Sequence, residues 1–101
     1  MNENRQRFLD ALRSGEFTQT FGEWLSHSNP TCCCAGGVAI NISGRMDEIG
    51  KSATGSEIVM DFLDVDTHFV VTLICINDEQ KTFAQIADWC EREWTANELP
   101  V

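Results

Sequence analysis

The pattern of apolar and polar positions predicts a helix near each end of the chain. In residues 3–13, Phe8, Ala11 and Leu12 fall on one stripe of a helix. Ser14-Gly15 follows directly, and a glycine supplies the left-handed residue that often ends a helix. The clearest helix begins at the capping box Thr82-Phe83-Ala84-Gln85 and continues with apolar residues at helical spacing: Ile86, Ala87, Cys90 and Trp94.

A second capping box, Thr54-Gly55-Ser56-Glu57, predicts another helix in the middle of the chain. Its buried stripe would consist of Ile58, Val59, Phe62 and Leu63. Residues 67–76 are ambiguous, because their Val, Ile and Thr content favours a strand whereas their apolar residues also fall on one helical face.

For three further segments, the sequence is compatible with more than one structure. Residues 17–25 are interrupted by Gly22 and fit either an extended segment or a helix. Residues 32–42 fit a tightly packed helix or a buried strand, in which Gly36-Gly37 allows close backbone approach. In residues 40–46, apolar and polar residues alternate on both sides of a Ser-Gly pair, which predicts a small β-hairpin or one irregular connection.

These elements predict a single domain that comprises residues 1–101. A chain of 101 residues is long enough for one domain and too short for two. With 43% hydrophobic residues, six Phe and three Trp, it has enough apolar side chains for a modest core. We therefore expect an α+β fold that is mainly α, with about four helices and a short β-hairpin.

The acidic residues are concentrated in the second half of the chain. The net charge is −9, and residues 1–46 carry equal numbers of acidic and basic side chains, so the whole excess lies in residues 47–101. This charge opposes direct binding of DNA or RNA, which depends on Lys and Arg at the phosphates. The acidic half is either a solvated surface or one anionic face that meets a basic partner.

Two groups of residues are candidates for contact with a partner. Asp61, Asp64 and Asp66, with His68, form the densest polar cluster. This cluster fits an acidic loop, a partner contact, or a calcium or magnesium site, although its spacing does not match the calcium-binding loop of an EF-hand.

The second group lies on the last predicted helix. Trp89 falls off the apolar stripe and is surrounded by Asp88, Glu91 and Glu93. Tryptophan is enriched at the energetic centres of interfaces, so Trp89 is either an interface anchor or the edge of the core.

The chain has an odd number of cysteines, three of them adjacent: Cys32, Cys33, Cys34, Cys75 and Cys90. This is a poor disulfide framework and an ordinary pattern for reduced thiols. Three adjacent cysteines point in different directions on any regular backbone, so at most two could bind one zinc ion. We expect buried, unreactive thiols, no metal or other cofactor, and no enzymatic activity.

No stretch approaches the roughly 18 apolar residues that a membrane span needs, and residues 1–5 do not lead into the apolar region of a signal peptide. We therefore expect a cytoplasmic protein that does not bind a membrane.

Three ordered blocks of residues resemble a family of small phage and prophage proteins of unknown activity. The blocks are ALRSGEF at residues 11–17 with Gln19, Gly22 and Leu25; Cys33-Cys34 with Gly37-Val38; and Ile76-Asn77-Asp78 with Lys81-Thr82-Phe83 and Ile86-Ala87-Asp88. The resemblance implies a phage or prophage origin and a host cytoplasm. It also implies a bend at Asn77-Asp78 between two helices, which favours a helix for residues 67–76.

Small size, one-sided negative charge and this resemblance predict a protein that binds and modulates or inhibits a host protein. It would act in host takeover or anti-defence, anti-CRISPR inhibition included, with its acidic face against a basic surface such as a nucleic-acid channel, as a DNA mimic. The candidate binding residues are Asp61, Asp64, Asp66, Asp88, Trp89, Glu91 and Glu93. The alternatives are a small zinc or thiol protein that uses residues 32–34, and a structural or oligomerisation module.

Overall fold

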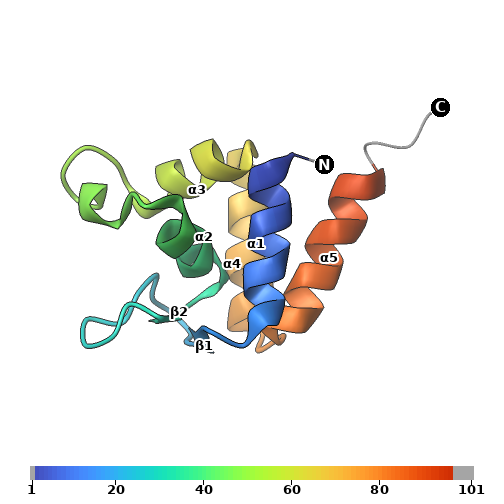
Figure 1. The fold of residues 1–101 in the computed structure, drawn as a ribbon, viewed down its shortest axis with the longest axis horizontal. Helices are drawn as coiled ribbons and strands as arrows, with labels where there is room; N and C mark the ends of the chain where they lie inside the picture. The colour runs from blue at the N-terminus through green and yellow to red at the C-terminus, as the bar shows by residue number, and fades with distance from the viewer. Residues whose placement is uncertain (1, 97–101) are drawn as a thin grey trace.

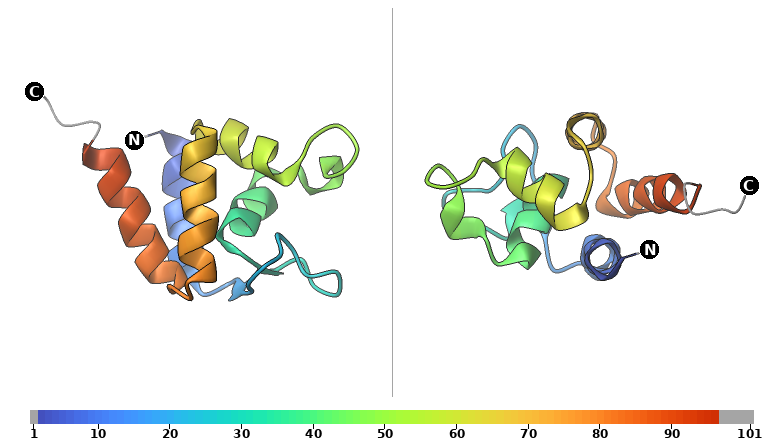
Figure 2. Two further views of the ribbon diagram at one scale, coloured as in Figure 1. Left: turned by 180° about the vertical axis from the view of Figure 1, so that it is seen from behind. Right: turned by 90° about the horizontal axis from the view of Figure 1, so that it is seen from above.

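Helices dominate the computed structural model, which describes residues 2–96. The described residues form one compact, mainly helical globule. Its elements are, in chain order, α1 (Glu3–Ser14), β1 (Thr18–Gln19), β2 (Cys32–Cys33), α2 (Ala35–Ser43), the 3-10 helix η1 (Met46–Glu48), α3 (Gly55–Leu63), α4 (Thr67–Asp78) and α5 (Phe83–Ala96). Helix α1 lies between the α2–α3 pair and α5 (Figure 1). Seen from behind, α4 lies in front of α1, and the view from above shows the two helices apart; α5 diverges from α4 after their shared turn (Figure 2).

Both predicted capping boxes are confirmed. The Thr54 hydroxyl accepts a hydrogen bond from the Glu57 N–H at 3.1 Å, and the Glu57 carboxylate accepts from the Thr54 N–H at 3.1 Å. Thr82 and Gln85 make the same reciprocal pair at 3.1 and 2.9 Å. Gly15 ends α1 in the left-handed conformation, with φ of 80°. Local hydrogen-bonding chemistry therefore sets these helix boundaries.

Replacing Thr82 with alanine should lower the free energy of unfolding by about 1 kcal/mol, because the Gln85 N–H loses its acceptor at the start of α5. Urea denaturation of the two proteins measures the difference. Thr82→Ser keeps the hydroxyl and should remain close to the parent. Equal stability of the Ala and Ser variants would show that this cap contributes nothing.

The predicted hairpin at residues 40–46 is wrong. Residues 40–43 continue α2, and Gly44, with φ of 74°, ends that helix. A glycine with positive φ ends a helix as readily as it turns a hairpin, and here burial of Val38, Ala39 and Ile40 favours the helix. The two strands instead form a parallel pair, in which Thr18 aligns with Cys32 and Gln19 with Cys33.

The segments that were compatible with two structures adopt different ones. Residues 17–25 are extended rather than helical, with β1 and an isolated bridge from Leu25 to Cys33. Residues 32–42 contain both predicted alternatives, strand β2 followed by helix α2. Residues 67–76 belong to α4, so the described part of the chain has five α-helices where about four were expected.

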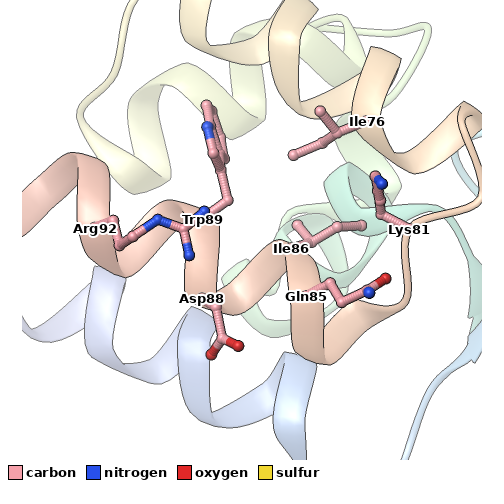
Figure 3. A pocket seen from close by; sticks show the side chains of 7 residues that line it. All are labelled: Ile76, Lys81, Gln85, Ile86, Asp88, Trp89 and Arg92. Carbon is pink, nitrogen blue, oxygen red and sulfur yellow. The ribbon is translucent and has the colours of Figure 1, made fainter.

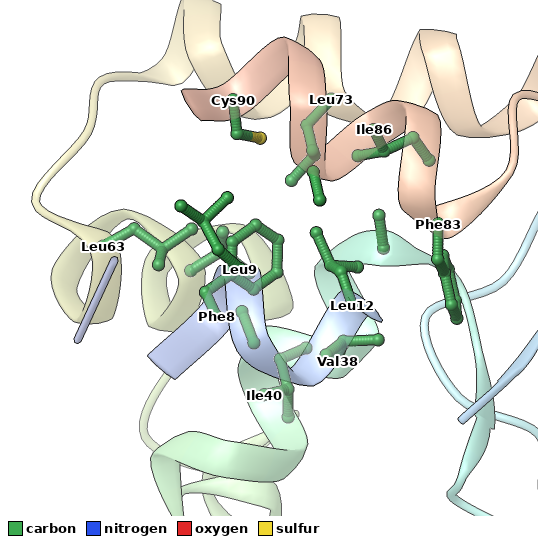
Figure 4. Close-up of a cluster of buried hydrophobic side chains, with 14 of the residues drawn as sticks. Phe8, Leu9, Leu12, Val38, Ile40, Leu63, Leu73, Phe83, Ile86 and Cys90 are labelled. Carbon is green, nitrogen blue, oxygen red and sulfur yellow. The ribbon is translucent and has the colours of Figure 1, made fainter. Parts of the chain in front are cut away.

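A continuous apolar core joins α1 to the other four helices (Figure 4). Helix α1 contributes Phe8, Leu9 and Leu12, all buried. Cys90 of α5 is fully buried in this core, as its place on the apolar stripe predicted. Within residues 2–96, no helix combines the length and the apolar character that crossing a bilayer requires.

Asn77 is the only buried polar residue of the described chain, and it joins three elements. Its Oδ1 accepts hydrogen bonds from the Gln19 side chain at 3.0 Å and from the Ala35 N–H at 3.1 Å. Its Nδ2 donates to the Thr20 carbonyl at 3.0 Å. Asn77 therefore fixes the end of α4 to the β1 segment and to the start of α2.

Three glycines lie directly against Trp24. A Cβ at Gly36 would come within 2.2 Å of the Trp24 ring, and one at Gly55 within 2.9 Å. At Gly37 a Cβ would lie 2.0 Å from the Trp24 carbonyl oxygen. The close backbone approach predicted for Gly36-Gly37 is therefore present, and Trp24 is what approaches them.

Candidate functional site

Arginines from the first half of the chain neutralise several acids of the second half. Arg13 on α1 forms ion pairs with Asp88 at 2.8 Å and Glu91 at 3.2 Å on α5. The hydrogen bond to Asp88 is the main cause of a raised pKa for the Arg13 guanidinium. Arg45 likewise pairs with Asp61 at 3.3 Å. Folding therefore places basic residues of the first half beside acidic residues of the second half.

Asp64 and Asp66 occupy the short connection between α3 and α4. Asp66 is the N-cap of α4, and its carboxylate accepts from the Phe69 N–H at 2.9 Å. Asp64 ends α3 in the left-handed conformation, with φ of 56°. Neither carboxylate forms an ion pair with another described residue. Both side chains are exposed at the surface.

Arg5 supplies the positive charge that the C-terminus of α3 favours. Its Nε donates to the Leu63 carbonyl at 2.8 Å and its Nη2 to the Asp64 carbonyl at 2.6 Å. Acidic residues at a helix C-terminus are unfavourable, and here a cation from α1 offsets this effect. The Asp64 carboxylate plays no part in these two bonds, which use backbone oxygens.

Three pockets along α4 and α5 are lined by five of the seven candidate residues. Their volumes are about 300, 270 and 300 Å³; the first two share Trp89, and the last two share Asp66 and Phe69. We call these three pockets together the α4–α5 groove. The candidate residues that line it are Asp64, Asp66, Asp88, Trp89 and Glu93. Asp61 and Glu91 do not line it.

Aromatic side chains form the middle of the α4–α5 groove. The Phe69 ring lies 5.1 Å from the Trp89 ring and 5.4 Å from the Trp94 ring, with Phe69 and Trp94 stacked at 12°. Trp94 is buried, whereas Phe69 and Trp89 are half-buried. Trp89 therefore lies at the edge of the core, which is one of the two alternatives drawn from the sequence, and it also lines the groove.

The two ends of the groove differ in charge. Asp64 and Asp66 line one end, where the Arg5 guanidinium is bound to the carbonyls of α3. Lys81 and Arg92 line the other end (Figure 3). These two cations were not among the residues predicted from the sequence, although they are two of the three basic residues in the acidic half and so carried a signal.

The cysteines lie apart from this groove. Burial raises the pKa of Cys33 and of Cys90 to about 12. Burial also raises the pKa of Cys34, against the opposing effect of hydrogen bonds from the Gly37 and Gly36 backbone. Thiolate formation is therefore disfavoured at all three. Among residues 2–96, no three His, Cys, Asp or Glu side chains are grouped so that they could hold a metal ion.

Comparisons of the chain with models of protein families, with curated proteins and with solved structures find no match. The geometry of the α4–α5 groove is consequently the basis on which a function can be proposed.

Proposed function

We propose that the chain is a phage- or prophage-encoded binding protein that engages a host protein through the α4–α5 groove and modulates or inhibits it. The observation that carries this proposal is the gathering of five candidate residues along one groove with a half-buried Trp89 at its centre. The origin rests on the sequence resemblance. The host cytoplasm follows from that origin.

Charge determines which partner surface suits the acidic end of the groove. The Asp64 and Asp66 carboxylates have no ion pair among the described residues, so a basic side chain of a partner can pair with them without displacing an internal arginine. The net charge of −9 adds long-range attraction to a basic surface and accelerates encounter. A host protein that binds nucleic acid has such a surface.

Trp89 supplies the apolar contact that charge alone does not. Its ring packs against Phe69 with the ring centroids 5.1 Å apart and the ring planes tilted by 34°, so it is already ordered before a partner binds. An ordered aromatic loses little side-chain entropy on binding, and such residues dominate interface energies. The partner therefore needs an apolar side chain next to its basic residues.

The test begins with recovery of the partner. The tagged protein is expressed in bacterial cells, purified with its bound proteins and compared by mass spectrometry with a tag-only control. Association with the recovered partner is then measured at low and high salt. For the Asp64→Asn/Asp66→Asn variant we expect association slowed about five-fold at low salt, with the difference largely lost near 0.5 M salt.

A matched control separates the groove from the overall charge. Asp61→Asn/Glu91→Gln removes the same charge at positions outside the groove, where each carboxylate pairs with an arginine. Asparagine retains both the N-cap at position 66 and tolerance of the left-handed conformation at position 64, so the groove variant should fold normally. Equal slowing by both variants, or an association rate that does not depend on salt concentration, would refute the proposed surface.

A further inference from the structure

The basic end of the α4–α5 groove stands out in a strongly acidic protein. Four arginines in the first half of the chain are engaged: Arg5 and Arg7 on backbone carbonyls, Arg13 and Arg45 on carboxylates. In contrast, the side chains of Lys81 and Arg92 make no hydrogen bond or ion pair with any residue in the range 2–96. Both line the same pocket.

This pocket combines the two cations with an apolar interior (Figure 3). Its volume is about 300 Å³, and Ile76, Ile86 and the Trp89 ring form the apolar part. Ile86 is fully buried and the other two are half-buried, so the interior is held by the core. A concave apolar surface with a few polar groups at its rim is typical of a ligand site.

The one acid at this pocket does not cancel its positive charge. Asp88 lies on the rim, but its carboxylate points toward α1 (Figure 3) and is paired with Arg13 at 2.8 Å. The Lys81 ammonium and the Arg92 guanidinium therefore remain available to an anion.

We propose that this pocket binds an organic carboxylate whose apolar body lies against Trp89 and Ile86 and whose charged group meets Lys81 and Arg92. A guanidinium and an ammonium both form charge-assisted hydrogen bonds with carboxylates, and the indole ring contributes apolar contact area. The carboxylate can belong to a free small molecule or to an acidic side chain that follows an apolar residue in a peptide. The proposal uses the opposite end of the groove from Asp64 and Asp66.

The indole N–H signals in the NMR spectrum of the ¹⁵N-labelled full chain provide the test. The chain has three Trp, so a Trp89→Phe variant assigns the relevant signal. The probes are 3-phenylpropionate, its neutral amide and the cationic 3-phenylpropylamine. We expect 3-phenylpropionate to move the Trp89 signal with a Kd of about 1 mM, the range set by ligand efficiency for a molecule of this size, and the amine to leave it in place.

Substitutions establish whether the two cations are responsible. Lys81→Gln/Arg92→Gln should weaken 3-phenylpropionate binding at least about ten-fold, which corresponds to about 1.4 kcal/mol. The matched control is Lys51→Gln, which removes one positive charge at a residue that does not line the pocket and should leave the affinity unchanged. It is compared with Lys81→Gln alone, which removes the same charge within the pocket. An unaltered thermal midpoint for each variant shows that the fold is intact.

Three results would overturn the proposal: equal shifts with the acid and the amine, no Trp89 shift at 10-fold the expected Kd, or full affinity in the Lys81→Gln/Arg92→Gln variant. A further arm distinguishes the two sources of carboxylate. Tighter binding of the peptide acetyl-Phe-Glu-amide than of 3-phenylpropionate supports an acidic side chain of a partner, and the reverse supports a free small molecule. Because these measurements need no host partner, their failure leaves the Asp64 and Asp66 experiment unaffected.

Discussion

Replacing Asn77 with alanine is expected to lower the free energy of unfolding by about 3 kcal/mol or more. The substitution removes one acceptor and one donor from a site that is completely buried. The Ala35 N–H and the Thr20 carbonyl lose their Asn77 partner at a point where α4, β1 and α2 meet. Each polar group left buried without a partner costs its desolvation energy, about 1 to 3 kcal/mol.

Asn41→Ala provides the comparison. The Asn41 amide also donates to backbone carbonyls, those of Pro30 at 3.0 Å and Gly37 at 2.9 Å, but Asn41 is only half-buried. Water can replace its bonds, so we expect a loss of about 1 kcal/mol. Guanidinium denaturation of both variants gives the two values. A loss at Asn77 no larger than that at Asn41 would show that these buried hydrogen bonds do not stabilise the junction.

Gly36→Ala is expected to cost about 2 to 3 kcal/mol, although alanine normally favours a helix over glycine. The new Cβ would lie 2.2 Å from the Trp24 ring, so the ring or the start of α2 must move. Trp24 also contacts Gly55, where a Cβ would lie 2.9 Å from the indole, so the ring has little room on that side. The measurement is again the free energy of unfolding in denaturant.

A double-mutant cycle isolates the clash from other effects of the substitution. In a Trp24→Ala background the ring is absent, so Gly36→Ala should become neutral or slightly stabilising, by about 0.5 kcal/mol. The coupling energy of the cycle should therefore be about 3 kcal/mol. If Gly36→Ala costs the same in both backgrounds, the glycine is required for a reason other than the approach of Trp24.

Elements set by local chemistry were predictable from the sequence. The capping boxes at Thr54 and Thr82 use groups three residues apart, so the signal and its structure occupy the same short segment. The end of α1 at Gly15 is equally local. The Ser43-Gly44 pair led to the wrong prediction of a hairpin, because a left-handed glycine occurs both at helix ends and in hairpin turns. Only the burial of α2 distinguishes the helix end from the hairpin.

Features that depend on distant residues were not predictable in the same way. The parallel pairing of β1 with β2 joins Thr18 to Cys32 across an irregular segment that has no pairing signal of its own. Asn77 did carry a signal, since it follows Val70 and Leu73 on the buried stripe of α4. A polar residue on such a stripe predicts a buried hydrogen-bonding site, but its partners cannot be read from the sequence.

The candidate site was predicted only in part for the same reason. Counting charges along the chain groups Asp61 and Glu91 with Asp64, yet the fold places Arg45 and Arg13 beside the first two. Chain position therefore overstated the extent of the unpaired acidic surface. The resemblance favoured a helix for residues 67–76, and that helix is one wall of the α4–α5 groove.

The arginines of α1 have a consequence for the order of folding. Their partners lie far along the chain, since Arg5 binds the Leu63 carbonyl 58 residues away and Arg13 binds Glu91 78 residues away. During synthesis α1 precedes the other described helices, but its last partner is made only when α5 appears. At about 5 to 20 residues per second, α1 waits several seconds for that partner. Helix α1 is thus among the last of the described helices to complete its native contacts, because those contacts require α3 and α5 to be present.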